Sequence, residues 1–197
     1  AILASPNIEA IFGRDDYGRS IIFRLFEGFK NSIEIILVVS LISCTTGVVI
    51  GTLSGYIGGK FDAIVSFIIN LFMSFPGILL AIAFAAMLNP GKLNLILALS
   101  IGGWVSYARL SRGQALMVRN FEYVKASRAM GASHWWIVGR HVIPSLSTPL
   151  LVEATYAVAG LIIAEASLSF LGLGLQAPEA SWGAMMRDSV RYLLVSP

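Results

Sequence analysis

The feature that most constrains this chain is a series of long stretches that carry almost no charge. Three stretches have no charged residue and a fourth is interrupted only by Glu153 and Glu165; they are residues 35–59, 63–91, 93–108 and 144–171. A helix needs about 20 mostly apolar residues to cross a bilayer, and strand-like alternation is absent here. The sequence therefore predicts an all-α, polytopic transmembrane helix bundle, with spans at about 32–56, 62–88, 93–117 and 144–170.

Composition excludes the other broad classes. Of the 197 residues, 56% are hydrophobic and 13% are charged, and the mean hydropathy is +0.78. Soluble domains carry about 25% charged residues, so a disordered tail, a disulfide scaffold and an ordinary soluble domain are all excluded. The single cysteine, Cys44, cannot form an internal disulfide or a metal site alone, and it is interpreted as a small buried apolar residue.

The charges indicate the topology. The connector, residues 109–141, holds six Lys or Arg residues and one acid, Glu122, so it is predicted to be cytoplasmic. We read the net charge of +3 as a topology signal and expect no nucleic-acid partner. The turn at 89–91 and both chain ends are then external. No signal peptide is visible at residues 1–7, so we expect an upstream span outside this sequence. Glu34 and Asp62, at span ends, are interpreted as solvated or near headgroups.

Two features inside the spans predict helix geometry. Glycines recur every fourth residue at Gly47, Gly51, Gly55 and Gly59, a stripe that favours close packing against another helix over a ligand role. Pro76 within Phe75-Pro76-Gly77 predicts a kink in the second span, either a fixed bend or a hinge.

Two short amphipathic external helices are expected at residues 20–29 and 182–195, the second capped by Ser181. They could shape the mouth of a pathway, but we favour the simpler role of covering apolar helix ends.

The connector itself predicts a helix, a stop and a second helix. Glu122 suits the positive end of a helix dipole, and Gly131 is a natural residue to end the helix. Ser133 then caps a second helix that runs to Pro144. Tyr123, Ala126 and Met130 share one helix face. From the residues alone, this first helix either docks against a partner protein or lies on anionic lipid.

A family resemblance favours the first of these readings. Ala126, Gly131 and Pro144 resemble the Glu-Ala-Ala loop of ABC-importer membrane subunits, although four other positions depart from it: Lys125, Ser127, His141 and Ile143. The flanking sequence resembles that of the C-type subunit in the dipeptide/oligopeptide/nickel branch of this family. The resemblance lies at residues 122–133, 164–174 and 181–183. Residues 13–19 also resemble an external motif of that branch, with Arg14 in place of Thr.

The resemblance implies one permease domain over residues 1–197, holding four of a probable six spans and a cytoplasmic coupling helix in a loop at about 119–143. It implies a peptide importer in a bacterial or archaeal plasma membrane. Its partners would be a second homologous permease, two cytoplasmic ATPases, an external solute-binding protein and membrane lipid. In the ATPase contact, the charges at the rim would be Glu122, Lys125 and Arg128. The packed face would be Tyr123, Ala126 and Met130, and the turn after the helix would be Gly131, Ala132 and Ser133.

Other functions are less well supported by the residues. The chain has no phosphate-binding loop of the Gly-x-x-x-x-Gly-Lys-Ser/Thr type, so we expect ATP to be bound and hydrolysed by separate partner subunits. The resemblance implies a transport subunit with no enzymatic activity and no cofactor of its own. Glu153 and Glu165 could line a pathway, but we favour burial within the bundle. They lie about 120° apart on a helix, which weakens the alternative of an ion-gradient-driven secondary transporter or channel. The spans also lack the Ser/His or paired-Asp arrangement of an intramembrane hydrolase. No metal site is expected.

Overall fold

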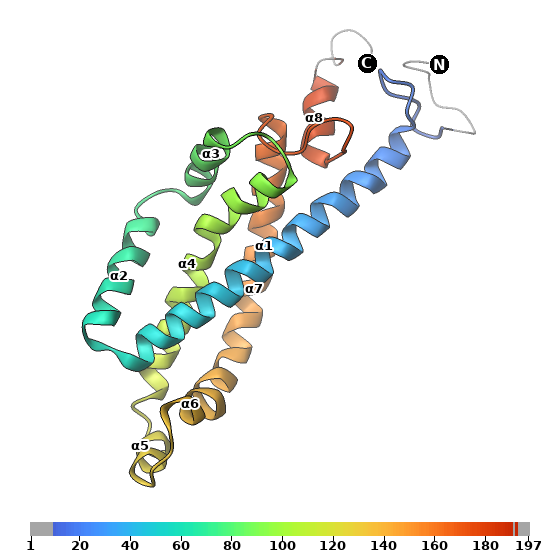
Figure 1. Cartoon of the computed structure of the whole chain (residues 1–197). Coiled ribbons are helices and arrows are strands. Elements are labelled where there is room, and N and C mark those ends of the chain that lie inside the picture. Colours follow the sequence, from blue (N-terminus) through green and yellow to red (C-terminus); the bar gives the residue numbers. More distant parts are fainter. Residues whose placement is uncertain (1–9, 191, 193–197) are drawn as a thin grey trace. The chain divides into compact units, whose positions relative to one another are not determined.

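The computed structural model describes residues 10–190 and 192. These residues form α-helices and one π-helical turn, η1, and they contain no β-strand; Arg14 and Ser20 form an isolated bridge. In chain order the elements are α1 (Ile21–Ile57), α2 (Gly59–Met73), α3 (Gly77–Met87), α4 (Lys92–Val118), α5 (Glu122–Ala129), α6 (His134–Ile137), η1 (Val138–Val142), α7 (Ile143–Phe170) and α8 (Trp182–Val190). Figure 1 labels the α-helices.

The all-α polytopic prediction is confirmed. Among the described residues, three continuous helices are long and apolar enough to cross a membrane: α1, α4 and the run His134–Phe170. The pair α2 and α3 passes the same test together, with a bend of 86° between its two halves. The predicted spans 32–56, 93–117 and 144–170 lie within α1, α4 and α7.

The kink predicted at Pro76 is a complete break. The helix α2 ends at Met73, and the Ser74 N–H donates to the Asn70 carbonyl at 3.0 Å. Pro76 has no N–H to continue the ladder, but its carbonyl accepts from Leu79 N at 3.0 Å and so begins α3. The second span therefore has the form of a broken span or a re-entrant loop.

The expectation of a separate helix at residues 20–29 is wrong, because residues 21–29 form the first turns of α1. No helix-breaking residue follows Phe29, and the polar side chains after it are satisfied. Asn31 Nδ2 donates to the Ala180 carbonyl at 2.9 Å, and Ser32 Oγ donates to Glu165 at 3.0 Å. Amphipathic character alone does not end a helix, so α1 continues into the apolar stretch.

The predicted external helix after Ser181 is present as α8, and Ser181 Oγ accepts from Ala184 N at 3.1 Å as a cap. Residues 191 and 193–195 of that prediction lie outside the described residues. The indole of Trp182 packs on Phe29 with ring centroids 5.6 Å apart.

The helix expected to end near Pro144 instead continues through it. Ile143 N–H donates to the Val138 carbonyl five residues back, which is the wider spacing of a π-helical turn. Pro144 lacks an N–H, and its ring would crowd a regular α-helical turn. The wide turn accommodates that ring, so α6, η1 and α7 form one continuous run.

The chain divides into two compact units, each described here by itself. One contains the described residues up to Val38, Ile82–Ala98 and the described residues from Leu161; the other contains Val39–Ala81 and Leu99–Gly160. Each of α1, α4 and α7 contributes residues to both units.

In the second unit, the glycine stripe packs α1 directly on the backbone of α4. A Cβ at Gly47 would lie 2.5 Å from the Trp104 carbonyl oxygen, and one at Gly51 would lie 2.8 Å from Ala108 Cα. Gly55 faces the Arg112 carbonyl in the same way. Gly59, the fourth member of the predicted stripe, has open space around it and a positive φ of 62°, so it belongs to the turn into α2. The packing role is therefore confirmed for three of the four glycines.

Replacing Gly51 by Ala tests this close approach. Alanine favours a helix over glycine by about 1 kcal/mol, but the added methyl group would force α1 and α4 apart at a cost of about 1–3 kcal/mol. We expect a net loss of unfolding free energy, measured by denaturant titration in detergent. Gly113→Ala, at a helical glycine of α4 with nothing within 4 Å of the new Cβ, is the matched control and should not destabilise. Equal stabilities of the two variants would contradict this interpretation.

Candidate functional site

The turn that ends α5 has the geometry predicted for Gly131. Gly131 has a φ of +88°, which costs little only for glycine. Its N–H donates to the Arg128 carbonyl, and Ala132 N donates to the Ser127 carbonyl, both at 3.0 Å. These two bonds form a Schellman motif, and Ser133 Oγ then accepts from Trp136 N at 3.2 Å to cap α6. The predicted helix, stop and second helix start are confirmed.

The inner face of α5 is anchored by Val124, which is 2% exposed. It packs in a cluster of buried residues from α1, α4, α6 and η1: Tyr56, Ala115, Val118, Ile137 and Val142. Burying a valine contributes about 1.5–3 kcal/mol. The helix α5 is therefore held against its unit from one side.

The opposite face of α5 is open. At 100° per residue, Glu122, Ala126 and Ala129 lie opposite Val124, and all three are exposed. Lys125 flanks this face and is also exposed. The outer face, defined here as Glu122, Lys125, Ala126, Ala129 and Met130, ends at Met130, which is 82% exposed.

Tyr123 and Arg128 make contacts within their own unit. The Tyr123 ring is 49% exposed, and its centroid lies 5.2 Å from that of His141. Arg128 lies on the Val124 side of α5, where Nη2 is 3.0 Å from His134 Nδ1 and Cζ is 5.9 Å from the Tyr56 ring centroid. The structure therefore separates Arg128 from Glu122 and Lys125, with which the sequence analysis grouped it. Ala132 is half-buried, and Ser133 serves as the cap of α6.

Arg119, just before α5, caps the C-terminal end of α1. Its Nη1 donates to the Gly55 carbonyl at 2.9 Å and to the Tyr56 carbonyl at 3.4 Å. The last carbonyls of a helix lack internal partners and carry partial negative charge, so a cation is favourable there. This bond ties the start of the α5 segment to the end of α1.

Asp62 is not the solvated residue that the sequence analysis expected. Its side chain is 16% exposed and is held by Arg112 in a bidentate pair, Nε to Oδ1 at 2.6 Å and Nη2 to Oδ2 at 2.8 Å. Ser54 Oγ also donates to Oδ1 at 2.7 Å. Planar, two-point pairing is the strongest geometry for such ions, and here it joins α1, α2 and α4.

Glu34, the other carboxylate at a span end, is more exposed. Its side chain is 53% exposed and accepts from Lys92 Nζ at 2.6 Å.

The two glutamates of α7 have different surroundings. Glu165 is 1% exposed and accepts hydrogen bonds from Ser32 Oγ at 3.0 Å and Ser169 Oγ at 2.8 Å. It therefore joins α1 to α7 within the first unit. Glu153 is half-buried, and its carboxylate forms no hydrogen bond or ion pair with another described residue. A pathway role for either stays a prediction.

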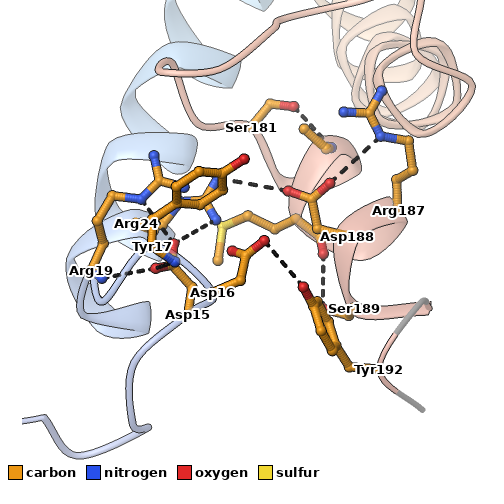
Figure 2. A network of polar contacts seen from close by, with 12 residues as sticks. Asp15, Asp16, Tyr17, Arg19, Arg24, Ser181, Arg187, Asp188, Ser189 and Tyr192 are labelled. Atoms are coloured by element: carbon orange, nitrogen blue, oxygen red, sulfur yellow. Dashed lines mark hydrogen bonds and ion pairs between the residues drawn. The ribbon is translucent and has the colours of Figure 1, made fainter. Parts of the chain in front are cut away.

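The loop at residues 13–19 folds around Asp15, as Figure 2 shows. Oδ1 accepts from the backbone N–H groups of Tyr17 at 2.9 Å and Arg19 at 2.8 Å. Oδ2 accepts from Arg19 Nε at 2.9 Å and from Arg24 Nη1 at 3.1 Å. Arg24 is 7% exposed, and its Nη2 also lies 3.9 Å from Asp188 of α8. Burial would raise the pKa of Asp15, but the hydrogen bonds from Arg19 and Tyr17 outweigh it and hold the pKa below its ordinary value.

Sequence reasoning missed several supporting residues. Val124 carried a usable signal, because it is the one branched aliphatic residue between Glu122 and Ala129. The Asp62–Arg112 pair carried none, since 50 residues separate its partners. Arg119 was counted only as a topology charge. The described residues contain no group of three or more His, Cys, Asp or Glu placed to hold a metal.

Together these features define a polytopic α-helical membrane protein in which the third and fourth spanning segments are joined by a short helix, supported on one side and open on the other. The sequence profile described as "Binding-protein-dependent transport system inner membrane component" matches residues 47–195. The chain belongs to this family of inner membrane proteins.

Individual relatives agree with this assignment. The chain is 40% identical over 194 residues to the probable D,D-dipeptide transport system permease protein DdpC of Escherichia coli K12, covering 98% of this chain and 65% of that protein. It is 38% identical to the dipeptide transport system permease protein DppC of Bacillus subtilis 168, covering 96% and 59%. It thus spans about three fifths of the length of these relatives.

Solved structures show the same fold. A chain of the inward-facing MetNI methionine ABC transporter, in its CY5 native crystal form, matches with a TM-score of 0.70 at 25% identity, covering 89% of both chains.

A double-mutant cycle tests the Asp62–Arg112 pair. Because the pair is bidentate and largely shielded, Asp62→Ala and Arg112→Ala should each destabilise, and their coupling free energy should be about 1–3 kcal/mol. The measurement is the unfolding free energy in detergent. The same cycle on Glu34 and Lys92, a more exposed pair, is the control and should give a smaller coupling free energy. Similar coupling free energies in the two cycles would contradict the assignment of the Asp62–Arg112 pair as a stabilising contact between helices.

The depressed pKa of Asp15 predicts an acid dependence of stability. The carboxylate is favoured in the folded state, so its contribution is complete above the unfolded pKa of about 3.9 and is lost as the pH falls towards the lower folded pKa. The melting temperature of the wild type should exceed that of Asp15→Asn at pH 7, and the difference should shrink below about pH 4. Asp16→Asn controls for loss of a neighbouring charge. A difference that stays constant down to pH 2 would refute the prediction.

Proposed function

We propose that this chain is the membrane-spanning permease subunit of an ATP-driven, binding-protein-dependent importer of peptides. Membership of the transport family supports the general role. Relatives named as D,D-dipeptide, dipeptide and oligopeptide permeases, at 38–40% identity, support a dipeptide or oligopeptide substrate. On this proposal, residues 1–197 are one permease domain that forms part of the translocation pathway. The chain has no enzymatic activity or cofactor of its own, and ATP is hydrolysed by separate subunits.

The observation that carries the proposal is the form of α5. Its outer face is exposed, while Val124 and the Schellman turn at Gly131 fix it from behind. Small side chains at Ala126 and Ala129 allow a partner groove to approach the helix backbone closely. A helix fixed in this way can pass on a displacement, whereas a loose loop would absorb it. We assign the outer face to contact with a cytoplasmic ATPase, with Gly131 setting the angle of the helix.

The supporting contacts suggest how a displacement of α5 would spread. Val124 and Arg119 connect the α5 segment to the end of α1, and the Asp62–Arg112 pair connects α1, α2 and α4. The helix α2 leads to the break at Pro76. ATP must bind one global state of the transporter more favourably than the other, and these connected helices would carry that preference to the broken span at Pro76.

The exposed apolar surface of the fourth span supports further partners. Only 6% of the most apolar window in His134–Phe170 is buried within the chain. Leu151, Tyr156 and Ile163 are 71%, 72% and 66% exposed. A second homologous permease subunit and lipid would cover this surface, and an external solute-binding protein would deliver the peptide.

Replacing Gly131 by Val tests the coupling role. A β-branched residue at φ +88° is strained by about 1–2 kcal/mol, so α5 should change its angle. In the reconstituted full-length transporter, peptide uptake per ATP hydrolysed should fall by about tenfold, the equivalent of 1.4 kcal/mol. Gly139→Val is the matched control: it also has open space around its Cβ but needs no positive φ, so it should retain coupling.

Two results would contradict the proposal. Unchanged coupling in the Gly131 variant would remove α5 from the coupling pathway. Peptide uptake by ATP-depleted vesicles under an imposed proton gradient would favour the ion-gradient-driven alternative.

A further inference from the structure

A cavity of about 430 Å³ lies on the inner side of α5, away from its outer face. It is lined by the end of α1, the last turn of α5 and the start of the α6 run: Leu53, Tyr56, Ile57, Arg128, His134, Trp135 and Val138. Two of these three elements belong to helices long and apolar enough to span the membrane, α1 and His134–Phe170. The cavity therefore lies at the ends of two helical runs that are long and apolar enough to span the membrane, where we expect lipid headgroups.

The polar groups of the cavity are suited to an anion. Arg128 has only donors, so His134 Nδ1, 3.0 Å from its Nη2, accepts from it, and the Tyr56 hydroxyl, 3.2 Å from the same nitrogen, also donates to it. With Nδ1 accepting, the proton of the neutral imidazole lies on Nε2. Guanidinium N–H groups and the imidazole Nε2–H are thus the donors available to a ligand. None of the lining residues is acidic, and Arg128 forms no ion pair with a carboxylate within the described part of the chain.

The walls and rim of the cavity are apolar. Leu53 and Val138 line it, and Ile57 and Trp135 stand at its edge with exposed fractions of 63% and 73%. A site for a free anion in water would not need large exposed apolar side chains beside its cation. Tryptophan is enriched at the headgroup level, where its ring meets both lipid and water.

We propose that this cavity binds the phosphate headgroup of an anionic phospholipid, in the inner leaflet if the basic connector faces the cytoplasm. Arg128 and the His134 Nε2–H hold the phosphate, and the apolar rim of Ile57 and Trp135 receives the glycerol and the first part of the acyl chains. The volume is within the usual range for sites that take small-molecule ligands, which suits the phosphate and glycerol of a lipid. Because the lining residues come from α1, α5, α6 and η1, a bound lipid supports α5 from its inner side.

The test uses the purified full-length protein, delipidated in detergent, with bound lipid counted by native mass spectrometry. Phosphatidylglycerol, phosphatidylcholine and inorganic phosphate are the three probes. We expect phosphatidylglycerol to bind in preference to phosphatidylcholine, and inorganic phosphate to compete only weakly. Arg128→Ala should weaken phosphatidylglycerol binding about fivefold, which corresponds to one cation near an anionic surface. Arg140→Ala removes an exposed cation of the same connector outside the cavity and should change binding less than twofold.

A second variant covers the case in which Arg128→Ala does not fold. Trp135→Ala changes a highly exposed side chain and should weaken lipid binding while leaving any phosphate binding unchanged. Equal binding of the two lipids, or equal losses in the Arg128 and Arg140 variants, would overturn the proposal. So would phosphate binding as tight as that of the lipid. Cross-linking of Arg128→Cys to an ATPase subunit in the assembled transporter would instead assign the cavity to a protein partner and overturn the lipid site.

Counting bound lipid by native mass spectrometry does not require peptide transport. The lipid site and the proposed function can therefore fail separately.

Discussion

The close contact between α1 and α4 is the constraint on which the second unit depends. Gly47, Gly51 and Gly55 let the α1 backbone rest on that of α4, so that no side chain separates the two helices. With the helices this close, a carboxylate at Asp62, one turn into α2, reaches Arg112 of α4 in a bidentate pair. The short tight turn through Gly58 and Gly59, both with positive φ, makes that position possible.

The same contact sets the position of α5. Once α1 and α4 are side by side, the end of α4 brings Arg119 to the last carbonyls of α1. Val124 then meets a cluster that includes Tyr56 and Val118, one from each helix. The inner side of α5 is therefore used for support and for the Arg128–His134 contact, and its outer side is exposed. A protein surface and a lipid cavity on opposite sides of one helix would not compete for the same residues.

Several local signals in the sequence were correct because they depend only on neighbouring residues. Gly131 ends a helix, Ser133 and Ser181 cap helices, and Pro76 interrupts one, each through backbone bonds made within a few positions. Two local predictions were wrong because the backbone around the predicted end of each helix allowed the helix to continue. Residues 20–29 were predicted to form a separate amphipathic helix, yet no helix-breaking residue directly follows Phe29. Pro144 looked like a stop, yet the π-helical turn η1 accommodates its ring.

The sequence by itself determined the membrane class, the all-α fold, the approximate spans and the helix–turn–helix of the connector, because hydropathy, charge asymmetry and turn chemistry are properties of short segments. The resemblance carried by residues 122–133 also anticipated the family. Only the tertiary structure decided that Asp62 pairs with Arg112, that Arg128 faces inward while Ala129 faces outward, and that Glu165 is enclosed between α1 and α7. Such contacts join residues that are far apart in the chain or on opposite sides of a helix, and no local pattern encodes which side of a helix its neighbours will cover.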